Sequence, residues 1–556
     1  MLRWLLLAGL VSLPKTQACS GVYWPQPVML QANTGRYSSL EAGSDGRLHL
    51  AYYDYDYARR DLRYAVRSAS GQWSFETVDT QGDVGWSASL ELDSGGIPHI
   101  AYAEYWPNFK LKYAVRRGPN DWVIETVDSE PGRGFYAYLA LDSAGNPHIA
   151  YTGNKEWDLR HAWKHPQLGW QFETIESAGD VGFYCAIVLD SADRCRISYY
   201  DRTNGRLKFA WQQPGGGWSI DVVDSSPEAG LDTSLVLDDQ EHPHIAYWDK
   251  GIDGVKYARH DGSQWHVETV ETGDFCGTEP SIRWAQAPRM SYAGTVGVRY
   301  AEKVAGHWRY YQLDRSGSKC SDTSLALEGA GHPRVTYLNL ADGALYYVEG
   351  VDSQLPGAPT PQPVSTIAAA RSKPDGTWIS LGGQVVSASG NVSGCYIEDP
   401  DRIAGICLVV PEYATMPVEG QQLQVVGVIE TKAGPERLIR VTDWTATGVP
   451  GVPGPLGLTL KGLETLVPTY PLTTLGLLVR VAGRVVTTGA GYIVLDDGSA
   501  APGEEGLRVR VGEGWSGPGV GQFAAVTGVI SIETIGGNPT AVLLPRRSGD
   551  IQVIPD

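Results

Sequence analysis

Residues 89–102 read Ser-Leu-Glu-Leu-Asp-Ser-Gly-Gly-Ile-Pro-His-Ile-Ala-Tyr, two apolar-polar alternations separated by a turn rich in Asp, Gly and Pro. This pattern predicts two short β-strands joined by a tight connection. Further strands are predicted at residues 111–114 (Leu-Lys-Tyr-Ala) and 122–127 (Trp-Val-Ile-Glu-Thr-Val). The stretch therefore predicts one four-stranded antiparallel unit.

The same unit recurs through the first 350 residues with a period of 45–50 residues. The tyrosine that ends its second strand occurs seven times, as Tyr52, Tyr102, Tyr151, Tyr199, Tyr247, Tyr292 and Tyr337. Four-stranded units with this period are typical of β-propeller blades, which bury their faces against one another. We therefore expect an all-β fold in which residues 19–350 form a seven-bladed β-propeller.

The seventh copy lacks its last strand, because a proline-rich segment begins at about Leu355. Residues 24–29, Trp-Pro-Gln-Pro-Val-Met, stand before Leu40 at almost the same offset as Trp73 before Leu90. We expect them to form the outer strand of blade seven, where an open edge tolerates proline. The alternative is that residues 20–33 are a disordered leader.

A second repeat, with a period of about 100 residues, follows the proline-rich linker at residues 351–365. Residues 383–386 recur as 483–486, and residues 420–427 recur as 521–528. We expect two small β-barrels, at residues 366–455 and 456–556, which resemble the OB-fold modules of secreted bacterial proteins. Acidic residues outnumber basic ones by 18 to 13 in residues 366–556, which favours a structural or adhesive role over nucleic-acid binding.

The net charge argues against anionic partners, and residues 1–19 indicate where the protein is located. The formal net charge is -18, so phosphate backbones and anionic lipid surfaces are repelled and nucleic acid is not an expected partner. Residues 1–18 contain Arg3 and an apolar run at residues 5–13, a pattern that predicts a signal peptide. Cys19 follows Ala18 as in a bacterial lipobox, so the chain is expected to be exported, either freely secreted or anchored to the envelope through lipidated Cys19.

The propeller repeats resemble those of bacterial sialidase-like and lectin-like propellers. The Asp-box of sialidases, S-x-D-x-G-x-x-W, is not reproduced, since the turn beginning at Asp142 has no closing tryptophan. The arginine cluster, tyrosine nucleophile and glutamate partner of sialidases are not recognisable either, so the resemblance does not imply that activity. Zinc-hydrolase, redox, esterase and phosphate-loop motifs are also absent from the sequence, and no cofactor is expected.

Recurrent histidines are candidate metal ligands, and the cysteines are candidate disulfide partners. The histidines His49, His99, His148 and His244 occupy one equivalent position in separate blades, which predicts a structural role and no metal. Three disulfides are predicted. The sequence pairs Cys395 with Cys407 across a hairpin, Cys276 with Cys320 between blades, and Cys185 with Cys195 on adjacent strands, which leaves Cys19 unpaired.

The candidate binding residues lie in two sets of loops that should share one face of the propeller. The first set follows the recurrent tyrosine and contains Asp54, Glu104, Asn154, Asp201, Asp249 and Asn339; the second precedes the Ser-Leu strand and contains Trp86, Tyr136, Tyr184, Asp232, Glu279 and Asp322. Acids, amides and aromatic rings together suit neutral sugars. We expect a non-catalytic protein that binds carbohydrate or another surface ligand. The alternatives are a sialidase-like or other glycan-degrading enzyme, since acidic pairs are plentiful, and a structural scaffold of the cell envelope.

Overall fold

The computed structural model describes residues 22–106, 109–153, 157–273, 277–294, 297–304, 306–314, 316–329, 331–352, 361–389, 395–410, 416–433, 436–448, 454–458, 476–499, 506–511, 517–535 and 538–555. The predicted signal peptide and Cys19 lie outside these residues. The chain divides into two compact units, one spanning Trp24–Val351 and the other containing Asp352–Asp556.

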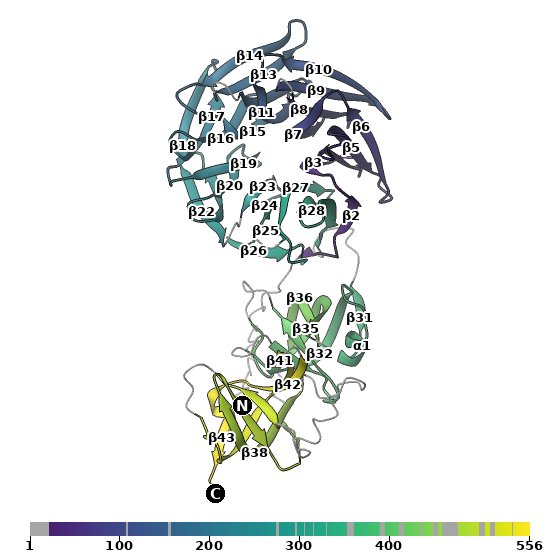
Figure 1. The fold of residues 1–556 in the computed structure, drawn as a ribbon, viewed down its shortest axis with the longest axis vertical. Coiled ribbons are helices and arrows are strands. Elements are labelled where there is room, and N and C mark those ends of the chain that lie inside the picture. The colour runs from purple at the N-terminus through teal and green to yellow at the C-terminus, as the bar shows by residue number, and fades with distance from the viewer. Residues whose placement is uncertain are drawn as a thin grey trace, which may run out of the picture. The chain divides into compact units, whose positions relative to one another are not determined.

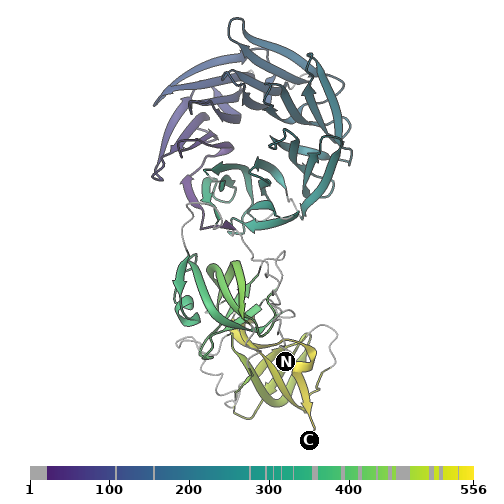
Figure 2. The same ribbon diagram turned by 180° about the vertical axis from the view of Figure 1, so that it is seen from behind.

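The first unit is a seven-bladed β-propeller, as predicted, and its sheets radiate from a central axis (Figures 1 and 2). The first three blades contain β3 (Arg36–Ala42), β4 (Leu48–Asp54), β5 (Asp61–Arg67) and β6 (Trp73–Asp79); β7 (Asp83–Leu92), β8 (Pro98–Trp106), β9 (Lys110–Gly118) and β10 (Asp121–Asp128); and β11 (Arg133–Leu141), β12 (Pro147–Gly153), β13 (Leu159–His165) and β14 (Gly169–Glu176).

Blades four to six repeat this antiparallel order. They contain β15 (Phe183–Leu189), β16 (Cys195–Asp201), β17 (Arg206–Gln212) and β18 (Trp218–Asp224); β19 (Ala229–Leu237), β20 (Pro243–Asp249), β21 (Gly254–His260) and β22 (Trp265–Thr272); and β23 (Thr278–Trp284), β24 (Pro288–Ala293), β25 (Val298–Val304) and β26 (His307–Gln312). The first strand of each blade lies nearest the axis, where it packs against the first strands of its neighbours.

Blade seven is completed by the N-terminal part of the chain. Its strands are β27 (Cys320–Glu328), β28 (His332–Asn339), β29 (Ala344–Glu349) and, at the outer edge, β2 (Val28–Gln31). Val28 pairs with Tyr347 and Met29 with Tyr346. The outer strand therefore begins four residues later than Trp24, after both prolines. A separate short sheet joins β1 (Val22–Tyr23) to β30 (Val351–Asp352).

The recurrent tyrosines connect each blade to the one before it. Each is buried, and its hydroxyl donates to a side chain at the end of the preceding outer strand, as in Tyr102 to Asp79 Oδ2 at 2.7 Å and Tyr247 to Asp224 Oδ2 at 2.7 Å. In blade one, Tyr52 donates to Gln31 Oε1 of β2 at 2.5 Å. The same kind of hydrogen bond that joins consecutive blades thus also joins the first blade to the last.

The second unit contains two closed five-stranded β-barrels, as predicted. The first is built from β32 (Trp378–Ala388), β33 (Cys395–Glu398), β34 (Gly405–Val409), β36 (Glu436–Gly448) and β35 (Gln422–Ala433), which pairs back onto β32. The second repeats this order with β38 (Leu478–Gly489), β39 (Tyr492–Asp496), β40 (Leu507–Arg510), β42 (Asn538–Pro545) and β41 (Phe523–Ile535). Closure removes the open edges that a five-stranded sheet would otherwise expose.

Short elements flank these barrels. They are β31 (Gln362–Val364), β37 (Leu456–Gly457), β43 (Ile551–Ile554), the helix α1 (Ile367–Arg371) and the 3-10 helix η2 (Ser548–Asp550). None of the helices in the described part of the chain has the length and apolar character needed to cross a membrane.

The barrels of the second unit share a buried, partly polar interface. Tyr396 and Cys407 of the first barrel belong to one apolar cluster with Leu478 and Val529 of the second. Beside it, the carboxylate of Glu436 accepts hydrogen bonds from Ser531 Oγ at 2.9 Å and from the Ile532 amide at 3.0 Å. Because these groups are buried and paired, the barrels of this unit pack as a single body.

Two of the predicted disulfides are wrong. Cys395 pairs in register with Leu408, and Cys407 with Tyr396, so the two thiols lie on opposite faces of the sheet. Cys195 lies opposite Leu189, four residues along β15 from Cys185, a separation of about 13 Å. Cys276 lies outside the described residues, so its pairing with Cys320 stays a prediction.

Candidate functional site

Every blade carries a β-bulge in its innermost strand. In blade one Arg36 pairs with Tyr53 and Ser39 with Ala51, so that two residues of β3 oppose one residue of β4. The first of the two, Tyr37, has a φ of 52°, in the left-handed region that side chains other than glycine rarely adopt. A bulge of this kind turns a side chain out of the regular alternation, and here it aims the side chain toward the axis.

The same left-handed position recurs once in each blade, with φ between 49° and 53°, and we call these residues the axial ring: Tyr37, Ser87, Tyr136, Tyr184, Asp232, Glu279 and Asp322. The ring is asymmetric. Its aromatic arc comes from blades one, three and four, and its acidic arc comes from blades five, six and seven. Strained backbone in all seven blades indicates that the fold holds these side chains in fixed positions.

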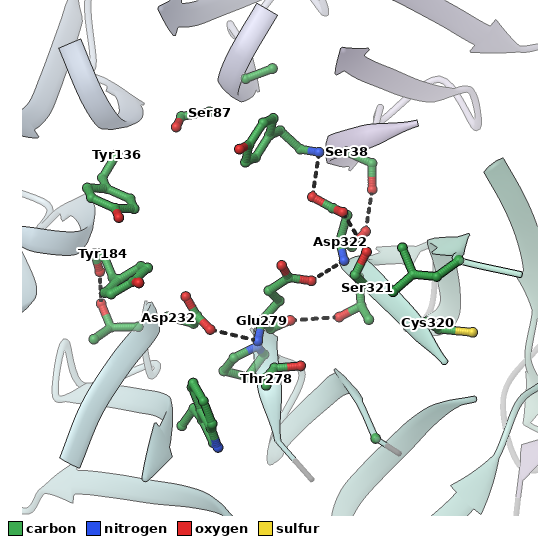
Figure 3. A pocket seen from close by; sticks show the side chains of 18 of the residues that line it. Ser38, Ser87, Tyr136, Tyr184, Asp232, Thr278, Glu279, Cys320, Ser321 and Asp322 are labelled. Atoms are coloured by element: carbon green, nitrogen blue, oxygen red, sulfur yellow. Dashed lines mark hydrogen bonds between the residues drawn. The ribbon is translucent and has the colours of Figure 1, made fainter. Parts of the chain in front are cut away.

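The axial ring surrounds a cavity of about 580 Å³ (Figure 3). Tyr138 and Trp248 add further aromatic surface, and Ser38, Thr233 and Thr323 add hydroxyl groups. The Tyr136 and Tyr184 rings lie side by side, with centroids 4.5 Å apart. The cavity thus presents aromatic rings on one side and carboxyl groups on the other, within the size range of small-molecule sites.

Hydrogen bonds between blades fix the acidic arc. Asp232 Oδ2 accepts from the Glu279 amide at 3.3 Å, Glu279 accepts from the Asp322 amide, and Asp322 Oδ1 accepts from the Tyr37 amide at 2.6 Å. Each carboxyl group therefore uses one oxygen to hold the next member of the ring. This arrangement orients the acids before any ligand arrives, which lowers the entropic cost of binding.

Burial and mutual repulsion raise the pKa values of the acidic arc. Burial, followed by the charge of Asp322, raises the pKa of Asp232 to about 6. Burial, together with the carboxylates of Asp322 and Asp232, raises the pKa of Glu279 well above its usual range, and burial raises that of Asp322. A carboxyl group with a raised pKa keeps its proton to a higher pH, and while it is protonated it can donate as well as accept a hydrogen bond.

Asp232→Asn is expected to stabilise the protein at pH 8 by about 1–2 kcal/mol and to have little effect at pH 4. The folded state raises the pKa of Asp232 to about 6, so this group favours folding when protonated and loses that contribution as pH rises through 6. Urea unfolding at pH 4, 6 and 8 measures the difference. Asp224→Asn is the matched control, and it should destabilise the protein at pH 8. Hydrogen bonds hold the pKa of Asp224 below its usual range, so its ionised form favours folding. An effect of Asp232→Asn that did not change with pH would contradict this electrostatic reading.

A second charged group lies on the innermost strands. Arg283 of β23 donates to Glu41 Oε1 of β3 at 2.5 Å, an ion pair between blades six and one. Burial, together with the neighbouring Glu41 carboxylate, raises the pKa of Glu91 to about 8. These three side chains do not line the 580 Å³ cavity. They form an acid pair with an arginine, a grouping that a glycan-cleaving enzyme could also use.

Five of the six predicted residues that precede the Ser-Leu strand come together around the cavity. Tyr136, Tyr184, Asp232, Glu279 and Asp322 all line the cavity. Trp86 does not, because its neighbour Ser87 occupies the bulge position. The Trp86 ring instead stacks on Tyr105 at a centroid distance of 4.0 Å, and its indole N–H donates to Asp83.

The first predicted set lies elsewhere and makes structural contacts. Asp54, Glu104, Asp201, Asp249 and Asn339 are buried, and none of these five lines the cavity. Asp249 is paired with Lys256 at 2.6 Å, and Asp201 with Arg206 at 3.3 Å. Asn154 lies outside the described residues. An acid two residues beyond the tyrosine is thus explained by ion pairing within the blade.

The cavity is also lined by four residues that the sequence pattern does not predict, Tyr37, Ser87, Tyr138 and Trp248. A signal for the first two was present, because six members of the ring stand two residues after a glycine, as Tyr37 follows Gly35 and Ser87 follows Gly85. Aligning the repeats on that glycine would have chosen Ser87 instead of Trp86. Tyr138 replaces the serine of the repeat, and Trp248 follows the recurrent tyrosine, so neither carries a signal of its own.

Comparison with known proteins shows similarity in fold only. No protein-family model matches the chain, and no curated protein matches its sequence. Among solved structures, the polysaccharide lyase Uly1 matches 61% of this chain and 99% of its own at 8% identity (TM-score 0.41). The SapL1 lectin, solved with α-methyl fucoside, matches 52% of this chain and 98% of its own at 14% identity (TM-score 0.39). The NanB sialidase of Streptococcus pneumoniae matches 58% of this chain and 70% of its own at 12% identity (TM-score 0.36).

Proposed function

We propose that the axial cavity of the propeller binds a neutral carbohydrate. The observation that carries the proposal is the division of the axial ring into an aromatic arc and an acidic arc around one cavity. Sugars have polar edges rich in hydroxyl groups and apolar patches of C–H bonds. The carboxyl groups of Asp232, Glu279 and Asp322 suit the hydroxyls, and the rings of Tyr136 and Tyr184 suit the apolar patches.

The charge of the cavity favours a neutral ligand over an anionic one. Among the described residues that line it, three are acids and only Lys319 is a lysine or arginine. A uronate or sialate carboxyl group would be repelled by the acidic arc, and placing it there would require further protonation. The net charge of -18 acts in the same direction over longer distances.

Binding to an array of neutral, amino and acidic glycans tests this proposal. We expect neutral glycans to bind, and the double variant Tyr136→Ala/Tyr184→Ala to weaken the affinity for the strongest of them at least about tenfold, as expected for loss of two contact rings. Tyr57→Ala is the control, because this side chain is 89% exposed and lies outside the cavity. Binding of acidic glycans alone, or an unchanged affinity in the double variant, would refute the proposal.

Glycan cleavage is the second candidate function, favoured by one observation. A carboxyl group with a raised pKa next to ionisable acids, as Glu279 is next to Asp232 and Asp322, is what a general acid requires. Incubation of the protein with each bound glycan, followed by mass spectrometry of the products, distinguishes the two functions. Cleavage that is lost in Glu279→Gln would replace the binding proposal with an enzymatic one, whereas an intact glycan supports binding.

The cellular setting is part of the proposal. We propose that the protein is exported, that its propeller meets the ligand outside the cytoplasm, and that lipidation of Cys19 provides any membrane attachment. The basis is the charged and apolar pattern of residues 1–18 and the cysteine that follows it. In this setting the barrels serve as a spacer or a second binding unit, and a scaffold of the envelope remains the alternative role.

A further inference from the structure

The interface between blades three and four departs from the propeller repeat at two positions that meet in space. In blade one the recurrent histidine contacts a tyrosine of the next strand, His49 Nδ1 lying 2.6 Å from the Tyr64 hydroxyl. His99 and Tyr113 form the same contact in blade two, and His244 and Tyr257 form it in blade five. In these three blades, therefore, the buried histidine is paired with a tyrosine hydroxyl.

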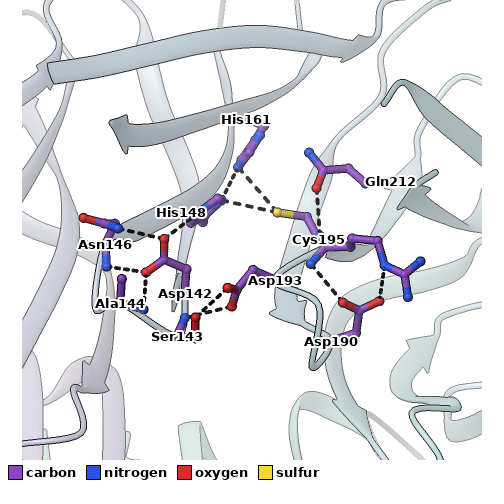
Figure 4. A network of polar contacts seen from close by, with 11 residues as sticks. Asp142, Ser143, Ala144, Asn146, His148, His161, Asp190, Asp193, Cys195 and Gln212 are labelled. Atoms are coloured by element: carbon purple, nitrogen blue, oxygen red, sulfur yellow. Dashed lines mark hydrogen bonds and ion pairs between the residues drawn. The ribbon is translucent and has the colours of Figure 1, made fainter. Parts of the chain in front are cut away.

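Blade three keeps the histidine, His148, but replaces its tyrosine partner with His161. Blade four, in turn, has Cys195 where blades two, three and five have the proline that precedes the histidine. Each replacement exchanges a residue that binds metals poorly for one of the commonest metal ligands. The two changes come from different blades, yet their side chains converge on His148 (Figure 4).

The three ligand atoms form a compact triangle. His148 Nδ1 lies 3.1 Å from His161 Nε2, and Cys195 Sγ lies 3.4 Å from the first nitrogen and 3.6 Å from the second. Bond lengths of about 2.0 Å for Zn–N and 2.3 Å for Zn–S in a tetrahedral site place such ligand atoms about 3.3–3.6 Å apart. The two nitrogen–sulfur distances lie in this range and the nitrogen–nitrogen distance of 3.1 Å is slightly shorter, so the spacing is close to that of three corners of a zinc tetrahedron.

The surroundings orient the ligands as metal sites require. His161 Nδ1 lies 2.9 Å from Glu173 Oε1, so the carboxylate holds the proton on Nδ1 and directs the lone pair of Nε2 into the triangle. The Trp163 ring stacks on His161 at 5.1 Å and limits its rotation. His161 and Cys195 are buried, while the His148 side chain is 13% exposed, which leaves one side from which an ion can enter.

We propose that His148, His161 and Cys195 bind one Zn²⁺ ion, with a water molecule as the fourth ligand. Binding converts the Cys195 thiol to a thiolate and releases its proton to solvent. Two ligands come from blade three and one from blade four, so the ion links neighbouring blades. Nothing in this site depends on the axial cavity, since none of its ligands lines that cavity.

Metal analysis of the full-length protein tests the proposal. We expect about one zinc per chain by mass spectrometric elemental analysis, and stripped protein should take up one Co²⁺ with the thiolate-to-cobalt absorption band of a cysteine ligand. Cys195→Ser and His161→Tyr should each abolish the absorption band, and His161→Tyr also restores the residue that other blades use, so this variant is expected to fold. Cys185→Ser is the matched control, because this buried thiol of the same blade contacts the Tyr136 carbonyl and lies outside the triangle.

Three results would overturn the zinc site. One is a folded wild-type protein that neither carries zinc nor shows the cobalt band. Another is a cobalt band that persists in Cys195→Ser or disappears in Cys185→Ser. The third is an equimolar content of copper without zinc, which would show that the same ligands select a different ion.

Discussion

Deleting residues 22–31 is expected to lower the free energy of unfolding of the propeller by about 3–5 kcal/mol, because the hydrogen bond of the Tyr52 hydroxyl, several strand hydrogen bonds and part of an apolar cluster are lost together. These residues include β2, which covers the edge of β29 in blade seven. Without Gln31, the buried Tyr52 hydroxyl has lost the acceptor that joins blade one to blade seven. Urea unfolding followed by tryptophan fluorescence measures the loss.

Single substitutions in β2 show which of its side chains contribute to closing the ring of blades. Met29→Ser should change stability by less than about 0.5 kcal/mol, since the Met29 side chain is 48% exposed. Gln31→Ala should cost about 1–3 kcal/mol, because the Tyr52 hydroxyl loses the acceptor to which it donates. A deletion that leaves the unfolding curve unchanged would show that β2 does not contribute to closing the ring.

Gly230→Ala is expected to cost about 2–4 kcal/mol, the sum of backbone strain and steric overlap. Gly230 precedes the bulge of blade five and has a φ of 109°. A Cβ atom at this position would lie 2.7 Å from Leu207 Cα of the preceding blade, and backbone atoms cannot move aside as a flexible side chain could. Urea unfolding of the variant measures the cost, and a lowered ligand affinity should accompany it because Asp232 lies two residues away.

Gly216→Ala is the control for this substitution. Gly216 also has a positive φ, 87°, but an added Cβ would have no neighbour within 4 Å. Gly216→Ala should therefore lower the free energy of unfolding only by the strain of the left-handed backbone, about 1 kcal/mol. Equal losses at the two positions would show that contact between blades is not what requires glycine at Gly230.

Much of the fold was predictable because it depends on local, repeated patterns. The period of the Ser-Leu and Pro-His-Ile-Ala-Tyr segments predicted seven blades, and the 100-residue period predicted two barrels; both are confirmed. Strand alternation and turn residues act over a few positions, so one sequence contains all the information that they need.

The wrong predictions concern positions where a shift of one residue in strand register changes which face of the sheet a side chain lies on. Trp86 was chosen in place of Ser87 because the bulge inserts an extra residue that alternation alone does not reveal. The Cys395–Cys407 bridge was predicted from their symmetric placement around a turn, whereas the strands pair one residue out of that symmetry. Side-chain direction in a strand reverses at every residue, so such a shift exchanges the two faces completely.

The sequence by itself determined the architecture of this protein: which residues form strands, how often the unit repeats, and which aromatic and acidic residues stand near the ends of the innermost strands. Only the tertiary structure decided which of them meet. The axial ring unites residues from seven blades, and the triangle of His148, His161 and Cys195 unites two. These contacts join positions separated by tens to hundreds of residues, and they depend on how neighbouring blades pack, which no local pattern in the chain encodes.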